Sequence, residues 1–189
     1  MLAADESGEK LSSQQAATVV LNLLFAGHET STGILGNCLR PLLGDRAAWE
    51  LIRADPSLIP NAVEEVLRLD SSVIAWRCRA TRDTALADVS IPAGANLVLL
   101  LGAGNRDPEI FPDPDCFDIR RSNAKDHLSF GHGVHLCLGR GLARLQARIV
   151  LEELSSRFPA LRLVPHVKLE FAPNISFRGP LSLPVVWNS

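Results

Sequence analysis

The stretch from residue 16 to 43 most constrains the fold, because apolar side chains recur on nearly every side of the helix that it predicts. The spacing of Ser12 and Gln15 predicts a capping box at the start of this helix, and no proline interrupts the pattern before Pro41. A helix that is apolar all round is enclosed by other parts of a protein. We therefore expect it in the middle of the molecule, preceded by a loop over residues 1–11.

The composition supports a globular domain and argues against several classes of partner. A chain of 189 residues with 47% hydrophobic residues can build one domain with a core, and its net charge of −2 gives no basic bias toward nucleic acid. The apolar runs at 19–26 and 97–104 are shorter than the ~20 residues that span a bilayer, so we expect no membrane partner.

The N-terminus and the cysteines bear on cellular location. The first residues lack the basic and then apolar order of a secretory signal. The cysteines are too widely spaced for a disulfide scaffold or for paired metal knuckles; they are Cys38, Cys78, Cys116 and Cys137. This usage favours a reducing compartment, and we expect a cytoplasmic protein.

The remaining pattern predicts a mainly α fold with small β-sheets, of the α+β class. Further helices are expected over residues 46–54, 57–69 and 140–158. Short strands are expected over residues 73–79, 84–86 and 96–101, with a turn at residues 92–94. The tail, residues 161–187, is proline-rich and strand-like.

Residues 130–139 form a glycine-punctuated loop that delivers Cys137 to the start of a helix. Gly131 and Gly133 permit backbone conformations closed to other residues, and they leave room for a flat ligand. Free amides and the positive end of the helix dipole favour a thiolate at Cys137. Because an exposed thiolate would oxidise, whereas iron would hold it deprotonated, the loop indicates metal ligation.

Two other interpretations of Cys137 are open. It can be a buried structural cysteine, because free cysteine packs as a small hydrophobe. It can also bind zinc with His132 and His135, although the paired-cysteine spacing of a structural zinc site is missing.

The apolar helix over residues 16–43 contains Ala26-Gly27-His28-Glu29-Thr30, in which the glycine alone costs about 1 kcal/mol relative to alanine. Gly27 would let a ligand lie against the backbone, and Thr30 can donate a hydrogen bond to the carbonyl of Ala26 and bend the helix. His28-Glu29 does not belong to a metalloprotease His-Glu-x-x-His helix, because position 32 is Thr32.

The loop resembles the haem-binding signature of the cytochrome P450 superfamily, in the form found in its soluble bacterial members. The matching residues are Phe130, Gly131, Gly133, His135, Cys137, Gly139, Leu142, Ala143 and Arg144. The resemblance implies haem b with Cys137 as the axial ligand of its iron, a ligand that favours O–O cleavage.

The same resemblance assigns roles to other residues. Glu29 and Thr30 would be the acid–alcohol pair that delivers protons during oxygen activation. Phe130, Gly131, Ala26 and Gly27 would line the haem, and His135 would be the partner of one propionate.

Glu65 and Arg68 resemble the structural Glu-x-x-Arg pair of this family, which is normally locked to an arginine in a meandering loop. Arg121 is the expected third member, with Arg120 as its competitor. By the same resemblance, Asn105-Arg106-Asp107-Pro108 is expected to start a helix, and the tail over residues 161–187 is expected to form terminal hairpins.

A second propionate partner is expected on the strand after that pair. The usual arginine position holds Cys78, with Arg77 and Arg79 on either side. Because adjacent strand residues face opposite ways, either arginine needs a slip of one residue or a bulge to reach the propionate. We favour Arg77.

The resemblance also implies partners. Arg140, Arg144 and Arg148 form a basic stripe that suits an acidic electron donor of the ferredoxin or flavodoxin type, although an ordinary solvated face and a structural role for Arg144 are alternatives. O2 would be the co-substrate. A hydrophobic organic substrate is expected from four apolar residues of the pocket wall, Leu23, Ile74, Ala75 and Trp76.

The resemblance covers residues 12–189 as one partial domain and corresponds to the C-terminal half of a family member, so the N-terminal half is expected to be missing. Two functional classes are open. The chain represents a haem-thiolate monooxygenase that uses electrons from NAD(P)H through redox partners, or it is a non-catalytic remnant or interaction module that keeps the motifs without stable haem binding.

Overall fold

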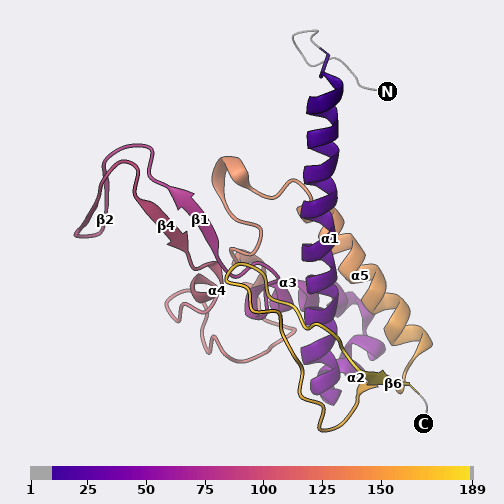
Figure 1. Cartoon of the computed structure of the whole chain (residues 1–189). Coiled ribbons are helices and arrows are strands. Elements are labelled where there is room, and N and C mark those ends of the chain that lie inside the picture. Colours follow the sequence, from indigo (N-terminus) through magenta and orange to yellow (C-terminus); the bar gives the residue numbers. More distant parts are fainter. Residues whose placement is uncertain (1–9, 188–189) are drawn as a thin grey trace.

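The computed structural model describes residues 10–187, so most of the predicted N-terminal loop at residues 1–11 lies outside the described residues. The helices are α1 (Ser13–Gly44), α2 (Arg46–Ala54), α3 (Ile59–Leu69), α4 (Leu101–Gly104) and α5 (Arg140–Arg157). The strands pair antiparallel as β1 (Trp76–Arg79) with β4 (Asn96–Leu99), β2 (Thr84–Leu86) with β3 (Val89–Ile91), and β5 (Arg162–Leu163) with β6 (Val185–Val186). The mainly α fold with small sheets is confirmed (Figure 1).

Helix α1 begins as the sequence predicts. The Ser12 hydroxyl accepts a hydrogen bond from the Gln15 amide, and the Ser12 amide donates to the Gln15 side chain. These two bonds satisfy amides that a helix start otherwise leaves without partners. The predicted capping box is therefore confirmed.

The expected enclosure of α1 holds only for its C-terminal half. Ile34, Cys38 and Leu42 are buried, whereas the large apolar side chains between residues 19 and 25 are 45% to 66% exposed. Figure 1 shows the reason: α1 projects beyond the other helices, which pack around its lower end. Within the described residues, the N-terminal half of α1 thus carries an uncovered apolar surface.

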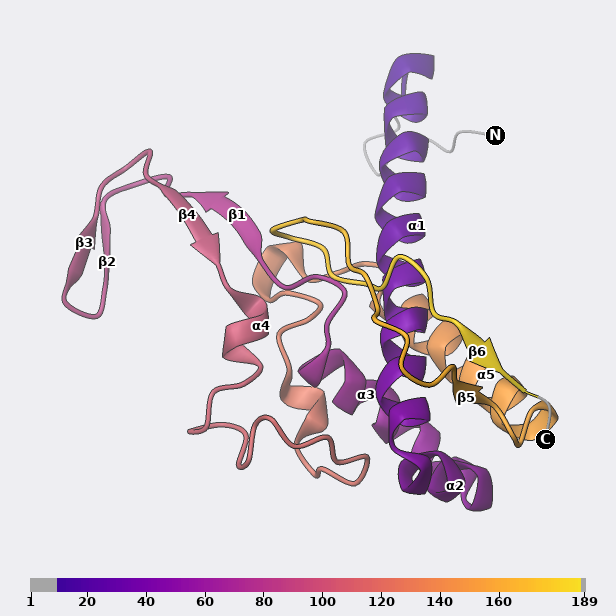
Figure 2. The same ribbon diagram turned by 60° about the horizontal axis from the view of Figure 1, so that its bottom comes forward.

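The core lies where the C-terminal half of α1 meets α2, α3 and α5 (Figure 2). Its centre includes Leu42, Trp49, Ile52, Val63 and Leu151, each at most 1% exposed. Asp45 caps α2 by accepting hydrogen bonds from the amides of residues 47 and 48. The chain then passes through a short 3-10 turn at Pro56–Leu58 into α3, so the helix predicted over 57–69 begins two residues late.

The region between α3 and the meander (residues 105–129) differs from expectation in detail. Strand β4 ends at Leu99 because residues 101–104 form α4, and β3 was not predicted. The expected helix start at Asn105 is wrong: Asn105 is the C-cap of α4, and the chain turns there instead. The predicted turn at residues 92–94 is confirmed, with Gly94 at a φ of +83°.

The C-terminal tail forms hairpin-like pairs, as predicted, but its regular strands are only two residues long. A bridge between Phe171 and Pro180 and another between Val73 and Phe177 tie the tail to itself and to the segment before β1. No helix among residues 10–187 has the length and hydropathy that crossing a membrane requires.

Candidate functional site

The Cys137 loop (residues 130–139) is closed by a backbone hydrogen bond at its base. The Cys137 amide donates to the Phe130 carbonyl across 2.9 Å, and the Leu136 amide donates to the Gly133 carbonyl across 3.0 Å. Gly131 and Gly133 have φ values of +71° and +72°, which side chains disfavour. The glycines are thus needed at these positions for the loop to fold back on itself.

Cys137 stands just before the start of α5. Its thiol is half-buried and free, and α5 begins at Arg140 without a side-chain cap among the described residues. The uncapped end and its dipole favour negative charge near this cysteine. The Arg140 guanidinium donates to the Cys137 carbonyl across 3.0 Å, which adds a second tie to the loop.

Two alternatives for Cys137 lose support from this geometry. The residue is not part of the buried core, which argues against a cysteine that only packs. No group of three or more His, Cys, Asp or Glu side chains in the described part of the chain could hold a metal ion, so the zinc set with His132 and His135 is not assembled.

The embedded motif of α1 has the local geometry that the sequence predicts. The Thr30 hydroxyl donates to the Ala26 carbonyl across 2.6 Å. A Cβ placed on Gly27 would meet no described atom within 4 Å, so the backbone there is open to a close neighbour. Glu29 is exposed and Thr30 is half-buried. Figures 1 and 2 both show the Cys137 loop, which leads into α5, beside this part of α1.

Gly27 also lines a groove of about 390 Å³ between α1 and α5. Its other walls include Ser31 and Leu35 from α1 and Ile149 and Val150 from α5. Ala26 and Thr30 do not line this groove, so the motif presents two different faces of α1.

The Glu65–Arg68 pair is fully buried and holds the meander. Arg68 donates to both carboxylate oxygens of Glu65, across 2.8 and 2.9 Å, while its outer nitrogens donate to backbone carbonyls of residues 105, 114 and 116. Such a fork neutralises charges that would otherwise be costly to bury. The pair therefore fixes the meander on α3.

Arg121 is the third member of this network, and Arg120 is not. Arg121 Nε donates to the Glu65 carboxylate across 3.1 Å, and the Asp118 amide donates to the same carboxylate across 3.0 Å. Arg121 is 9% exposed, whereas Arg120 is exposed. The prediction that Arg121, and not Arg120, joins the Glu65–Arg68 pair is confirmed.

A second ionic cluster was missed by sequence reasoning. Glu64, the neighbour of Glu65, accepts hydrogen bonds from Arg144 Nε and Nη2 across 2.6 and 2.9 Å, and its Oε2 lies 3.1 Å from His127 Nε2. Burial acts to raise the pKa of Glu64, but hydrogen bonds from His127 and Arg144 and the charge of Arg144 outweigh it and lower that pKa to about 2. Glu64 is therefore ionised at neutral pH.

The basic stripe expected along α5 is correspondingly reduced. Arg144 forms an ion pair with Glu64, which agrees with the alternative that Arg144 has a structural role. Arg148 also has a partner, because its Nε lies 3.2 Å from Oε1 of Glu152 on the same helix. The stripe was expected from spacing alone, which cannot show that Arg144 has a partner 80 residues earlier in the chain.

Arg77 lies exposed on β1, in a ladder without the predicted slip. Arg77 pairs with Val98, Cys78 with Leu97 and Arg79 with Asn96, one residue against one. Arg77 and Arg79 therefore share a face, and Cys78 points to the other. Arg79 Nε donates to the Gly94 carbonyl across 3.0 Å. The slip or bulge that either arginine needs to reach a propionate is therefore absent from this ladder, and Arg77 stays a prediction that the register does not support.

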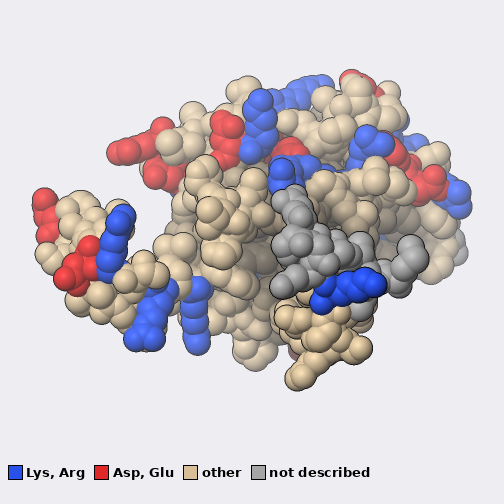
Figure 3. Space-filling view, turned by 90° about the horizontal axis from the view of Figure 1, so that it is seen from above, with Lys and Arg blue, Asp and Glu red and all other residues tan. Residues whose placement is uncertain are grey.

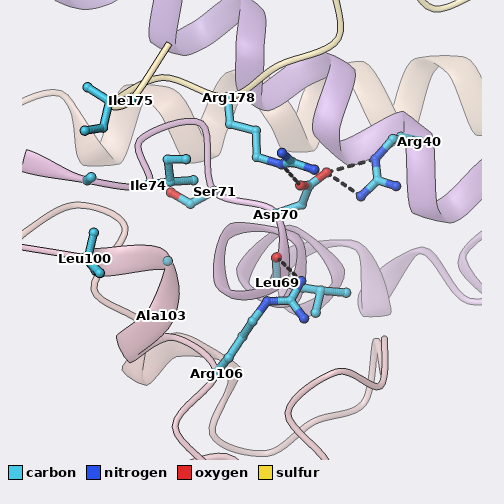
Figure 4. A pocket seen from close by; sticks show the side chains of 12 residues that line it. Arg40, Leu69, Asp70, Ser71, Ile74, Leu100, Ala103, Arg106, Ile175 and Arg178 are labelled. Atoms are coloured by element: carbon cyan, nitrogen blue, oxygen red, sulfur yellow. Dashed lines mark hydrogen bonds and ion pairs between the residues drawn. The ribbon is translucent and has the colours of Figure 1, made fainter. Parts of the chain in front are cut away.

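Two of the four predicted substrate-wall residues line one cavity. Ile74 and Ala75 face a cavity of about 520 Å³ with Leu100, Ala103 and Ile175 (Figure 4). At its side Asp70 is held between the guanidinium groups of Arg40 and Arg178. Leu23 and Trp76 are 58% and 53% exposed and lie outside the cavity lining.

The described residues fit a flat apolar ligand held by Cys137. Val134 and Leu138 of the Cys137 loop are 97% and 86% exposed, and the apolar surface of α1 is also open. In the view from above, charged side chains lie along the upper rim and on the arm that carries β1 and β4, with some near the middle, while much of the rest is uncharged (Figure 3). His135 is exposed on the same loop and available to a charged group of such a ligand.

Comparisons with known proteins agree with the family resemblance of the Cys137 loop. A family model described as "Cytochrome P450" matches residues 50–171. The chain is 43% identical over 187 residues to Cytochrome P450 107B1 of Saccharopolyspora erythraea, covering 98% of this chain and 46% of that protein. It is 41% identical to the cytochrome P450 monooxygenase PikC of Streptomyces venezuelae, covering 97% of this chain and 44% of that protein.

A solved structure agrees in three dimensions. The structure of cytochrome P450 CREJ superposes with a TM-score of 0.92 at 46% sequence identity, covering 97% of this chain and 46% of that chain. The chain thus spans about half the length of the curated relatives it matches. Members of this family bind haem iron, the group that the Cys137 loop suits. From the matched motifs, the identity and the shared fold, the chain belongs to the cytochrome P450 family.

Proposed function

We propose that this chain carries the haem-ligating and proton-delivering residues of a haem-thiolate monooxygenase, which inserts one oxygen atom of O2 into a hydrophobic organic substrate. Electrons would come from NAD(P)H through a donor of the ferredoxin or flavodoxin type. The observation that carries this proposal is the closed Cys137 loop at the uncapped start of α5. The name of the relative PikC, a monooxygenase, supports the reaction class.

Cys137 would hold haem b through its thiolate, with Phe130 and Gly131 at the base of the loop on the same side. Ala26 and Gly27 of α1 would also line the haem site, and a Cβ placed on Gly27 would meet no described atom within 4 Å. His135 would meet one propionate, because buried carboxylates need cationic or hydrogen-bonding partners. When bound, the haem would supply the oxidising chemistry, to which a thiolate ligand contributes electron density.

Thr30 and Glu29 would move protons at the α1 side of the site. The Thr30 hydroxyl donates its hydrogen to the Ala26 carbonyl. Its oxygen is therefore free to accept a hydrogen bond from the next proton donor of a relay. Glu29 is exposed, so its carboxylate can take protons from solvent and pass them toward Thr30. Their adjacent positions in the embedded motif of α1 support this role.

The substrate would lie against apolar walls. Ile74 and Ala75 are placed by the segment that leads from α3 into β1, and Leu23 and Trp76 add exposed apolar surface on α1 and β1. Surfaces of this kind favour hydrophobic or mixed organic molecules. The alternative of a non-catalytic remnant is not favoured, because the motif residues are retained and the named relatives are cytochromes P450.

The absorption spectrum of the reduced protein with carbon monoxide tests this proposal. Protein prepared with excess haem should show the red-shifted Soret band of thiolate-ligated haem. Cys137→Ala should abolish the band, whereas Cys116→Ala, which changes an exposed cysteine of the meander, should keep it. An unchanged band in Cys137→Ala would refute the proposal.

A further inference from the structure

Two adjacent carboxylates on α3 serve different parts of the chain. Glu65 is committed to Arg68 and Arg121 and so to the meander. Glu64 instead binds His127, at the end of the meander, and Arg144, on α5 beyond the Cys137 loop. These two partners of Glu64 flank the Cys137 loop in sequence, and Glu64 bridges them.

The hydrogen bonds around His127 fix which of its ring nitrogens carries the proton. The Ser129 amide donates to Nδ1 across 3.1 Å, so Nδ1 is an acceptor. The proton of a neutral ring is then on Nε2, which donates to Glu64 Oε2. The His127 side chain is 1% exposed, so this orientation is held inside the protein.

The partners of Glu64 both contact the ring of Phe130. The Arg144 guanidinium lies over that ring at 4.6 Å from its centroid, and the His127 ring lies 5.7 Å away at a tilt of 52°. The cation–π attraction holds the ring against the guanidinium, so a carboxylate that fixes the position of the guanidinium also fixes where the ring packs. Glu64 supplies that carboxylate.

Phe130 in turn holds the backbone of Cys137. Its carbonyl accepts the hydrogen bond from the Cys137 amide at the base of the loop. A movement of Phe130 would therefore change the bond that closes the loop. This gives a continuous line of contacts from Glu64 through Arg144 and His127 to Phe130 and then to Cys137.

We propose that Glu64 is a positioning residue for the Cys137 loop, acting through Arg144 and His127 on Phe130. The inference rests on the proposed function, in which Cys137 is the iron ligand. Glu64 would make no contact with substrate or haem. Its role is to keep Phe130, and with it the Cys137 amide, in one arrangement.

Hydrogen exchange of the loop amides tests the inference without haem or activity. In Glu64→Gln, peptides covering residues 130–139 should exchange roughly ten- to hundredfold faster, because charged hydrogen bonds that hold Phe130 are lost. Peptides from the core of α2 should be unchanged. The matched control is Glu152→Gln, which removes the exposed partner of Arg148 on the same helix as Arg144 and should leave the loop unchanged.

A second variant keeps the test valid if Glu64→Gln does not fold. Phe130→Leu removes the aromatic ring but leaves the ion pairs, and it should loosen the same peptides. Loop exchange at the wild-type rate in whichever of these variants folds would overturn the inference. So would equal acceleration across the whole chain, because that result means general destabilisation.

The carbon monoxide spectrum separates this inference from the proposed function. Glu64→Gln loaded with haem should lose part of the red-shifted band to a form without thiolate ligation. If Cys137→Ala abolishes the band while Glu64→Gln leaves band and loop exchange unchanged, the inference alone fails. If the wild-type protein shows no red-shifted band, the proposed function fails instead.

Discussion

The carboxylate of Glu65 on α3 receives the guanidinium of Arg121 from 56 residues farther along the chain, and both groups are buried. Arg121 also donates to backbone carbonyls of residues 112, 113 and 116. The Asn61 side chain adds bonds to the carbonyls of residues 119 and 121. The meander has little regular structure, so these bonds substitute for the ladders that helices and strands supply.

Removing the Glu65 carboxylate should therefore destabilise the fold strongly. Glu65→Gln should lower the free energy of unfolding by about 3–5 kcal/mol, because two buried guanidinium groups lose their counter-charge. Arg120→Lys, at the exposed neighbour of Arg121, should change it by less than about 0.5 kcal/mol. Urea unfolding followed by circular dichroism measures both. If Glu65→Gln left the free energy of unfolding unchanged, the meander would be held by other contacts.

Stability should also depend on pH through Glu64. Its pKa is lowered in the folded protein from 4.5 to about 2, so its ionised form contributes stability above pH 4.5 that is lost as the pH falls toward about 2. The difference in unfolding free energy between wild type and Glu64→Gln should be constant above that range and shrink through it. A difference that does not vary with pH would contradict the assigned ion pairs.

The cysteines should differ sharply in reactivity. Burial of Cys38, and secondarily the nearby negative charge of Asp70, raises the pKa of its thiol to about 12. At about pH 8, Cys38 should resist iodoacetamide in the folded protein, because the thiolate is the nucleophile. Exposed Cys116 should be alkylated, and mass spectrometry of digested peptides distinguishes the two. Rapid labelling of Cys38 without unfolding would show that α1 is not packed as described.

Thr30 should matter for coupling and not for haem binding. In a haem-loaded enzyme that contains this chain and is supplied with reductant, Thr30→Ala should divert consumed electrons to peroxide and lower product per NAD(P)H by at least roughly tenfold, because a proton relay is lost. Thr30→Ser keeps the hydroxyl and should retain most coupling. Peroxide and product assays on the two variants measure this. Unchanged coupling in Thr30→Ala would mean that Thr30 only packs.

Local patterns predicted several features well. The capping box at Ser12 and the bond from Thr30 to Ala26 depend on residues three or four apart, so spacing suffices to predict them. The network of Glu65 with Arg121 spans a long separation and was predicted from the family resemblance, not from physical chemistry alone. The contact between Glu64 and Arg144 spans 80 residues, and although Arg144 belongs to the matched signature, nothing in the sequence named Glu64 as its partner.

Other differences have physical causes that local patterns do not contain. Strand β3 pairs with β2 through a tight turn in which Ala87 has a φ of +50°, a conformation that alanine seldom adopts, so no turn signal marks it. The exposure of α1 between residues 19 and 25 depends on which elements reach it, and helical periodicity does not show that.

The nature of the iron ligand tests the account most directly. X-ray absorption at the iron edge of the haem-loaded protein should show one sulfur scatterer, and Cys137→His should show none, although Cys38, Cys78 and Cys116 remain in the variant. Because those cysteines are unchanged, loss of the sulfur signal assigns the ligand to Cys137. A wild-type spectrum with only nitrogen and oxygen ligands, or a sulfur signal that survives in Cys137→His, would contradict the central claim.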